Sequence, residues 1–298
     1  MEKTGKYMNL TTDFAFKHIF GPDANPAYIL SFLNALLEGE KEIVKVTFVD
    51  KEHVGDSADD RALIYDLHCV TSTDEKIIIE MQNRYQTHFR DRALVYVSAD
   101  LYHQAKRGDW DYRINPVYGI FMMNFDWKEF EGDPMREDVY LTTKTTGKIF
   151  SDKLRMIFLK IPLMEKRSEE CETVLDMWMY LFKNSEKMTK MPRNFLKCKT
   201  FEDLERTASL ATLTKEEQMA YDHSLKVLRD NYAIADHERR QGRAEGRAEG
   251  RAEGRAEGRI AERNEIVMTM LAKGCDVDFI SNMLNIPKEE ILNISNRI

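Results

Sequence analysis

The sequence is poor in the features that mark secreted and membrane proteins. Its four cysteines, spread over 298 residues, form no CxxC pair, which excludes a zinc ribbon and argues against a disulfide framework. No run approaches the roughly 18 consecutive apolar residues of a membrane span, and no apolar segment typical of a signal peptide follows Met1. We therefore expect a cytoplasmic protein without a membrane partner.

The chain also lacks an excess of positive charge. It has 51 acidic and 44 basic residues, which gives a formal charge of −7. Proteins that coat nucleic acids without specificity are strongly basic, so that class is excluded. Any contact with DNA or RNA must depend on a local group of basic residues.

Changes in composition along the chain predict four parts. In residues 1–164, apolar runs of strand length alternate with helical patterns, as in an α/β domain. Residues 165–240 have an almost wholly helical pattern, residues 241–259 contain a Gly-Arg-Ala-Glu repeat, and residues 260–298 form a small helical tail unit. We expect an α/β domain with a helical C-terminal extension.

The first part contains the elements of one sheet with helices around it. Thr12 is the predicted N-cap of a short helix that stops at Gly21, and a second helix follows Pro26. The second and third strands are predicted to form a hairpin, because turn-forming residues separate them. The predicted strands are 43–50, 62–70, 76–82, 116–125, 139–145 and 154–161, with a long helix at 87–106.

Acidic residues interrupt two of these apolar strands. Glu80 follows three isoleucines, and Asp66 breaks the run before it. Alternation places Glu80 and Gln82 on one face, and hairpin pairing would set Asp66 opposite Glu80. Two facing carboxylates repel unless a cation lies between them, which suits Mg²⁺ or Mn²⁺. Lone acidic residues near strand ends are usually rim residues, so spacing alone indicates only a candidate metal site. His68 shares the face of Asp66, either as a ligand or as a satisfied buried histidine.

Four short motifs carry a resemblance to a known family. They are 13–21 (DFAFKHIFG), 31–37 (SFLNALL), 79–82 (IEMQ), and Arg92 and Tyr96 spaced after Phe89. With the order of elements, they resemble the PD-(D/E)XK nuclease superfamily and, more narrowly, the recombination-promoting nuclease (Rpn) and transposase-associated branch found in bacteria. The resemblance covers about residues 9–163 and implies a restriction-endonuclease-like core of order α-β-β-β-α-β.

This resemblance implies a chemistry. Asp66 and Glu80 would bind the catalytic divalent ion, and Gln82 replaces the family's lysine, a substitution that this branch tolerates. An amide can position a water molecule but cannot act as a base or a cation. The implied activity is Mg²⁺-dependent hydrolysis of DNA, associated with recombination or mobile elements. The alternatives are a nuclease for another nucleic acid, and a degenerate nuclease fold that binds DNA or protein without cutting.

Other polar residues are candidates for the same site. Asp13 and Lys17 lie one helical turn apart, so both can face it, Asp13 as a further carboxylate and Lys17 as a phosphate contact or as the missing lysine charge. A surface ion pair is the equal alternative. Arg84, Arg92 and Tyr96 are candidates for substrate binding, because Arg92 and Tyr96 share a helix face.

The repeat that begins at Gly242 has a period of four residues. On a helix each residue type forms a ridge that turns by about 40° per repeat, so arginine and glutamate ridges lie apart. No Glu of the repeat lies three or four positions from an Arg, and each glycine costs a helix about 1 kcal/mol. The segment is either a flexible spacer or a long helix that pairs with a second copy, arginine ridge against glutamate ridge, in a homodimer.

The tail beyond the repeat is predicted to hold three short helices. The first spans residues 266–271 and is broken at Gly274, the second spans residues 277–284, and the third starts at Pro287. This rhythm is that of helix-turn-helix units, but the acidic start of the last helix favours docking of a partner over entry into a DNA groove.

Overall fold

The computed structural model describes residues 5–49, 52–53, 63–105, 108–125, 132 and 134–295. It divides into two compact units, Met1–Tyr232 and Ala233–Ile298, and the finer division into four parts remains a prediction. The helices are α1 (Asp13–Phe20), α2 (Pro26–Leu36), α3 (Phe89–Tyr102), α4 (Val174–Asn184), α5 (Lys199–Thr207), α6 (Lys215–Ala272), α7 (Val277–Leu284) and α8 (Lys288–Ser295). The strands are β1 (Val46–Phe48), β2 (Glu52–His53), β3 (Leu63–Ile64), β4 (Leu67–Thr71), β5 (Lys76–Gln82), β6 (Val117–Met123), β7 (Arg136–Thr142) and β8 (Ile149–Lys160).

Six strands form one mixed sheet in the order β1-β4-β5-β6-β8-β7, which confirms the predicted α/β class. The pairs β1–β4, β4–β5 and β7–β8 are antiparallel, whereas β5, β6 and β8 run parallel. β5 has the predicted bounds, β4 and β5 form the predicted hairpin, and β7 and β8 extend one edge as expected. β2 and β3 pair separately.

Most of the other predicted strands differ from the structure at their ends, as 43–50 does from β1, 139–145 from β7 and 154–161 from β8. Two further predictions are wrong in ways that concern the site. The strand expected at 62–70 is divided into β3 and β4, so Asp66 lies directly before a strand and not within one. The helix expected at 87–106 is α3, which starts later because His88 adopts the left-handed conformation with a φ of 65°. Residues 50, 62 and 106, at the ends of predicted elements, lie outside the described residues.

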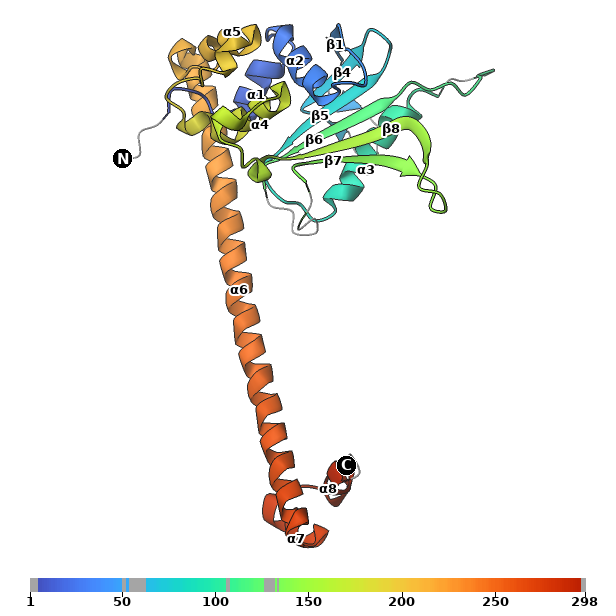
Figure 1. The fold of residues 1–298 in the computed structure, drawn as a ribbon, viewed down its shortest axis with the longest axis vertical. Helices are drawn as coiled ribbons and strands as arrows, with labels where there is room; N and C mark the ends of the chain where they lie inside the picture. The colour runs from blue at the N-terminus through green and yellow to red at the C-terminus, as the bar shows by residue number, and fades with distance from the viewer. Residues whose placement is uncertain are drawn as a thin grey trace. The chain divides into compact units, whose positions relative to one another are not determined.

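Helices cover both faces of the sheet (Figure 1). Ile77 and Ile79 point from β5 into a core shared with α1, α2 and α4, whereas Ile78 points into a second core shared with α3. Alternation along a strand explains this division, and the continuous apolar run of β5 follows from burial on both sides. The same alternation directs Glu80 and Gln82 toward the α3 side.

Capping side chains define where the first two helices begin. The hydroxyl of Thr12 accepts a hydrogen bond from the Ala15 N–H at 3.3 Å, which confirms the predicted N-cap. Asn25 caps α2 through the Ala27 N–H at 3.0 Å, with Pro26 as the first helical residue. Both caps satisfy backbone donors that a helix start leaves without partners, so α1 has a defined origin.

The helices after the sheet close over the α1–α2 side of the first unit. The indole of Trp178, on α4, is fully buried and packs on Phe20 and on Phe201 with ring-centroid distances of 5.1 and 5.0 Å. Its N–H donates to the hydroxyl of Ser31 at 3.2 Å. Large aromatic rings with a satisfied polar atom are well suited to such an inter-helix core.

The second unit has its own small core. Val267 of α6 packs with Ile280, Ile286 and Ile291. The short helix predicted at 266–271 is wrong, because this segment continues α6 without a break as far as Ala272. Among the described residues, no helix combines the length and apolar character needed to cross a membrane.

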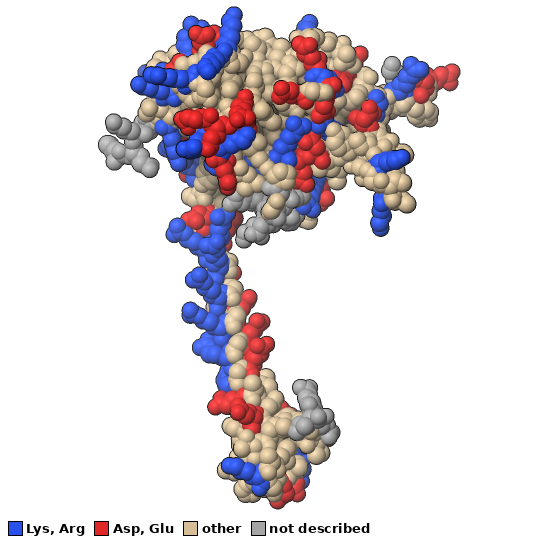
Figure 2. Space-filling view, in the orientation of Figure 1, with Lys and Arg blue, Asp and Glu red and all other residues tan. Residues whose placement is uncertain are grey.

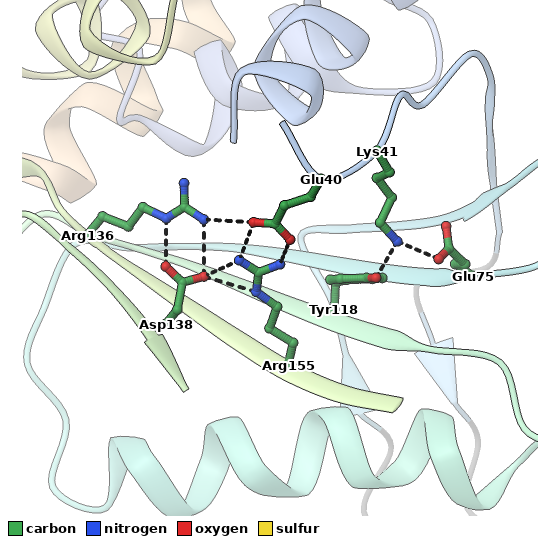
Figure 3. A network of polar contacts seen from close by, with 7 residues as sticks. All are labelled: Glu40, Lys41, Glu75, Tyr118, Arg136, Asp138 and Arg155. Atoms are coloured by element: carbon green, nitrogen blue, oxygen red, sulfur yellow. Dashed lines mark hydrogen bonds and ion pairs between the residues drawn. The ribbon is translucent and has the colours of Figure 1, made fainter. Parts of the chain in front are cut away.

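A polar network lies on the same side of the sheet as α2 (Figure 3). Arg155 of β8 is 5% exposed, and its guanidinium donates to Glu40 at 2.9 Å and to Asp138 at 2.6 Å. Arg136 also pairs with Asp138 at 2.7 Å. Because Arg155 is buried, its charge is tolerated only with these carboxylates in place.

Replacement of Arg155 by methionine should therefore destabilise the first unit. The change leaves Glu40 and Asp138 without their main buried partner, so we expect the free energy of unfolding to fall by about 2–4 kcal/mol. Urea unfolding followed by circular dichroism measures it. The control is Arg167→Met, which removes an exposed ion pair to Glu170. A loss as small as that of the control would contradict a structural role for the network.

Candidate functional site

Asp66 and Glu80 meet at the end of the β4–β5 hairpin. The register pairs Leu67 with Ile79, and one further step places Asp66 opposite Glu80. Glu80 is 2% exposed, and Asp66 is partly buried. The site lies where β5 ends, on the side of the sheet that carries α3.

Each of the two carboxylates accepts a hydrogen bond from the backbone of the opposite strand. The Asp66 N–H donates to Glu80 Oε1 at 3.1 Å, and the Met81 N–H donates to Asp66 Oδ2 at 2.7 Å. Side chains thus take the place of backbone carbonyls just beyond the last paired residues of the ladder. This exchange explains why the predicted strand breaks at Asp66, since buried N–H groups need a partner and here find a carboxylate.

The two carboxylates disfavour each other's ionisation. Burial raises the pKa of Glu80 to about 8, with a further increase from the charge of Asp66 and an opposing effect of Arg92. Burial also raises the pKa of Asp66, while the Met81 N–H and the charge of Lys17 lower it. A cation bound between them would favour the ionised forms of both.

The donor set has the chemistry of a hard divalent ion. Two carboxylates and the carbonyl of Met81 offer oxygen only, and Mg²⁺ is commonly held by one or two carboxylates with water completing its shell. Within the described parts of the chain, no three His, Cys, Asp or Glu side chains are grouped to hold an ion. Zinc sites take three or four protein ligands. The two carboxylates therefore suit Mg²⁺ or Mn²⁺ better than Zn²⁺.

Gln82, Arg92 and Tyr96 surround Glu80. The amide of Gln82 donates to Glu80 Oε2 at 2.9 Å, and Arg92 Nη2 donates to the same oxygen at 3.2 Å. Arg92 also donates through Nε to the Tyr96 hydroxyl at 3.1 Å, and its guanidinium lies 5.0 Å from the centre of the Tyr96 ring. The structure thus brings these three candidates together, with the charge of Arg92 directed at the carboxylate.

Asp13 and Lys17 approach the site from α1 on the other side. Their side chains form an ion pair at 2.5 Å, and both are substantially exposed. Their charges act on the pKa of Asp66 in opposite directions. Asp13, predicted as a further metal ligand, pairs with Lys17 on the surface of α1, and it is not grouped with Asp66 and Glu80 into a three-carboxylate cluster. Arg84 is half-buried in the turn between β5 and α3.

A polar cluster holds the start of α1 against the ends of β5 and β6. Asn83 donates to the carbonyl of Thr11 at 2.7 Å, and Asn124 donates to Asn83 at 2.9 Å and to the Thr11 hydroxyl at 3.0 Å. Asn83 and Asn124 follow directly after the parallel strands β5 and β6. The ends of parallel strands are where α/β sheets place their functional residues. The cluster fixes where Lys17 stands relative to Asp66, and sequence reasoning missed it.

Asp100 is a second residue that sequence reasoning missed. His68 Nε2 lies 2.7 Å from Asp100 Oδ2, and both side chains are buried. His68 is thus a histidine with a buried carboxylate partner, one of the two alternatives the sequence left open. The signal was present, because Arg92, Tyr96 and Asp100 are spaced by four and form one face of α3 toward the sheet.

A family model described as PD-(D/E)XK nuclease family transposase matches residues 10–238. The chain belongs to this family. Searches of curated proteins and of solved structures each found no match. PD-(D/E)XK nucleases generally use divalent metals, so the family and the oxygen donors of Asp66 and Glu80 agree in the kind of ion they suit.

The raised pKa of Glu80 predicts how stability changes with pH when EDTA is present. Folding favours the protonated form, so this stabilisation is complete below the pKa of an unfolded glutamate and is lost as pH rises through about 8. Between about pH 6 and about pH 9, wild type should lose on the order of 2 kcal/mol relative to Glu80→Gln, which does not titrate. Thermal unfolding of both proteins across this interval measures the difference. Parallel pH profiles would refute the raised pKa.

Proposed function

We propose that this protein is a Mg²⁺-dependent endonuclease that hydrolyses DNA phosphodiester bonds in recombination or in the movement of mobile elements. The observation that carries the proposal is the pair of buried Glu80 and partly buried Asp66, held face to face by hydrogen bonds to the opposite strand. Membership of a nuclease family supports a catalytic role for these two carboxylates.

Asp66, Glu80 and the carbonyl of Met81 are the proposed ligands. A bound Mg²⁺ or Mn²⁺ would supply a water of lowered pKa and stabilise the charge that develops on the phosphate. Gln82, fixed by its hydrogen bond to Glu80, would orient the attacking water. An amide cannot accept the proton, so the proton would pass to solvent or to the substrate itself.

The cationic residues have separate proposed roles. Lys17 would contribute the positive charge that Gln82 lacks and would contact a phosphate of the substrate, with Asp13 holding its ammonium group in place. Arg92 would leave or share its contact with Glu80 to meet the DNA backbone together with Tyr96. Arg84 would add a further contact from the turn before α3. These residues supply positive charge locally in a chain with a net charge of −7.

The nuclease proposal predicts metal-dependent nicking of supercoiled plasmid. Asp66→Asn and Glu80→Gln keep the shapes of the side chains but remove the charges, so each should lower the rate by at least about 100-fold. EDTA should abolish the activity of wild type, and Mg²⁺ or Mn²⁺ should restore it. Agarose gels of the nicked and linear products measure the rates.

The matched control is Asp91→Asn, the same chemical change on the exposed start of α3. Its rate should equal that of wild type. Nicking that persists in EDTA, or equal rates for wild type and Asp66→Asn, would overturn the assignment. Single-stranded RNA, supplied in a parallel reaction, distinguishes a ribonuclease from the proposed deoxyribonuclease.

The role of Lys17 predicts a loss of activity without a loss of stability. Because its ion pair with Asp13 is exposed, Lys17→Gln should change the free energy of unfolding by less than about 1 kcal/mol. The nicking rate should nevertheless fall by about ten-fold, and Lys17→Arg should recover part of it. Thermal melts and plasmid assays on the same preparations measure both effects. An unchanged rate would leave the ion pair as a surface contact only.

A second candidate is a nuclease fold that binds DNA or protein without cutting. It is favoured by the contact of Arg92 with Glu80, because an arginine that neutralises the carboxylate competes with an ion for it. In that case purified protein binds plasmid in a gel-shift assay but produces no nicks in Mg²⁺ or Mn²⁺. We also propose that the chain forms a homodimer through residues 241–259 and that it is located in the cytoplasm.

A further inference from the structure

The middle of α6 is a helix without neighbours in its own unit. Every residue of the repeat is exposed, and the glycines at 242, 246, 250, 254 and 258 have open space where a Cβ would stand. Within the repeat, Arg255 and Arg259 donate from Nε to carbonyls one turn earlier at 3.1 and 3.2 Å. With glycine at every fourth position and no Glu spaced to pair with an Arg, such a helix needs support from outside.

The sequence of α6 places opposite charges at the two ends of one helix face. Because the period of four exceeds the helical period, each ridge drifts by about 40° per repeat, so a straight line along the helix passes from one residue type to another. The line through Arg243 has Arg239 and Arg247 within about 40° of it. Farther along, the same line meets Gly250 and Gly254.

The acidic end of this face follows the two glycines. Glu257 and Glu265 lie within about 40° of the same line, with Ala261 between them. Figure 2 shows Arg and Lys gathered along one side of the exposed helix, with Asp and Glu elsewhere along it. We call the strip along the line through Arg243, from Arg239 to Glu265, the charged face. It is basic at its N-terminal end, small in the middle and acidic at its C-terminal end.

The charged face is complementary to itself when two copies run antiparallel. With the twofold axis at the level of Ala252, Arg247 meets Glu257 of the second copy, and Arg239 meets Glu265, since each pair lies equally far from that level. Gly250 then faces Gly254 of the second copy, where the missing side chains let the two backbones approach closely. The paired segment, from residue 239 to residue 265, is about 39 Å long.

A parallel pair of the same two faces would be disfavoured by repulsion between like charges. In that arrangement the basic end of one copy lies beside the basic end of the other, and the acidic ends also coincide. Like charges in contact disfavour such a complex, so the charge pattern selects the orientation as well as the partner.

We infer that the charged face of α6 binds the same face of a second copy of this chain, antiparallel and centred on Gly250 and Gly254. The inference gives an orientation and a register to the homodimer proposed above. It rests on no step of the nuclease chemistry, so each can fail without the other.

Charge reversal tests the pairing through mass in solution. Arg239→Glu with Arg247→Glu sets two acidic side chains opposite Glu265 and Glu257 of the second copy. Glu257→Arg with Glu265→Arg sets two basic side chains opposite Arg247 and Arg239. Each double variant of the full chain should weaken dimerisation by at least about ten-fold. The variant with all four changes should recover it, because both charged pairs are restored with their signs exchanged. Light scattering after gel filtration, at low and high salt, measures the association.

The matched control is Arg255→Glu with Arg259→Glu, which changes the charge equally but lies about 120–160° from the face. It should dimerise like wild type. Wild type that stays monomeric at every concentration and salt overturns the inference, as does failure of the fourfold variant to recover. If Arg239→Glu with Arg247→Glu leaves the mass unchanged and weakens plasmid binding instead, the face contacts nucleic acid and the inference is wrong.

Cysteine cross-linking tests the orientation. A mixture of Arg247→Cys and Glu257→Cys chains should form a disulfide-linked dimer under mild oxidation, while Arg247→Cys alone should stay at the background level set by the native cysteines of wild type. A parallel pair gives the reverse result, because residue 247 then meets its own counterpart. That result would overturn the antiparallel arrangement.

Discussion

The candidate site depends on two hydrogen bonds that join carboxylates to backbone N–H groups across a hairpin. Through them Asp66 and Glu80 end the ladder between β4 and β5 and are held together at the same time. The N–H groups favour the ionised forms, while burial and mutual repulsion favour the protonated ones. Because these effects oppose each other, a positive charge nearby can shift both carboxylates toward their ionised forms. Arg92 from α3 and Lys17 from α1 both lower the pKa of Asp66 through their charge.

The rest of the first unit fixes these cations relative to the hairpin. α3 packs against the sheet through the same face that carries Arg92 and Tyr96, so their position follows from the core beneath them. α1 is set by its Thr12 cap and by the polar cluster of Asn83 and Asn124. Rigid elements on both sides therefore hold charged side chains around the end of β5, which is how sites gain defined geometry.

Sequence reasoning succeeded where the signal was local. The bounds of β5 follow from its apolar run, and the Thr12 cap from its position before an amphipathic segment. It failed where contacts between distant segments decide the outcome. No local pattern predicts that Asp66 lies outside the strands and that its carboxylate accepts a hydrogen bond from the Met81 N–H. Likewise, the buried position of Arg155 depends on Glu40 and Asp138, which are remote in sequence.

Because the repeat has a period of four residues, a change in repeat number alters both the length of α6 and the direction in which its far end faces. One added or deleted Gly-Arg-Ala-Glu unit moves everything beyond it by about 6 Å and turns it by about 40° about the helix axis. A change of a few units therefore rotates the acidic end out of line with the basic end. The repeat number of this chain is therefore part of what brings the basic and acidic ends of the charged face into line.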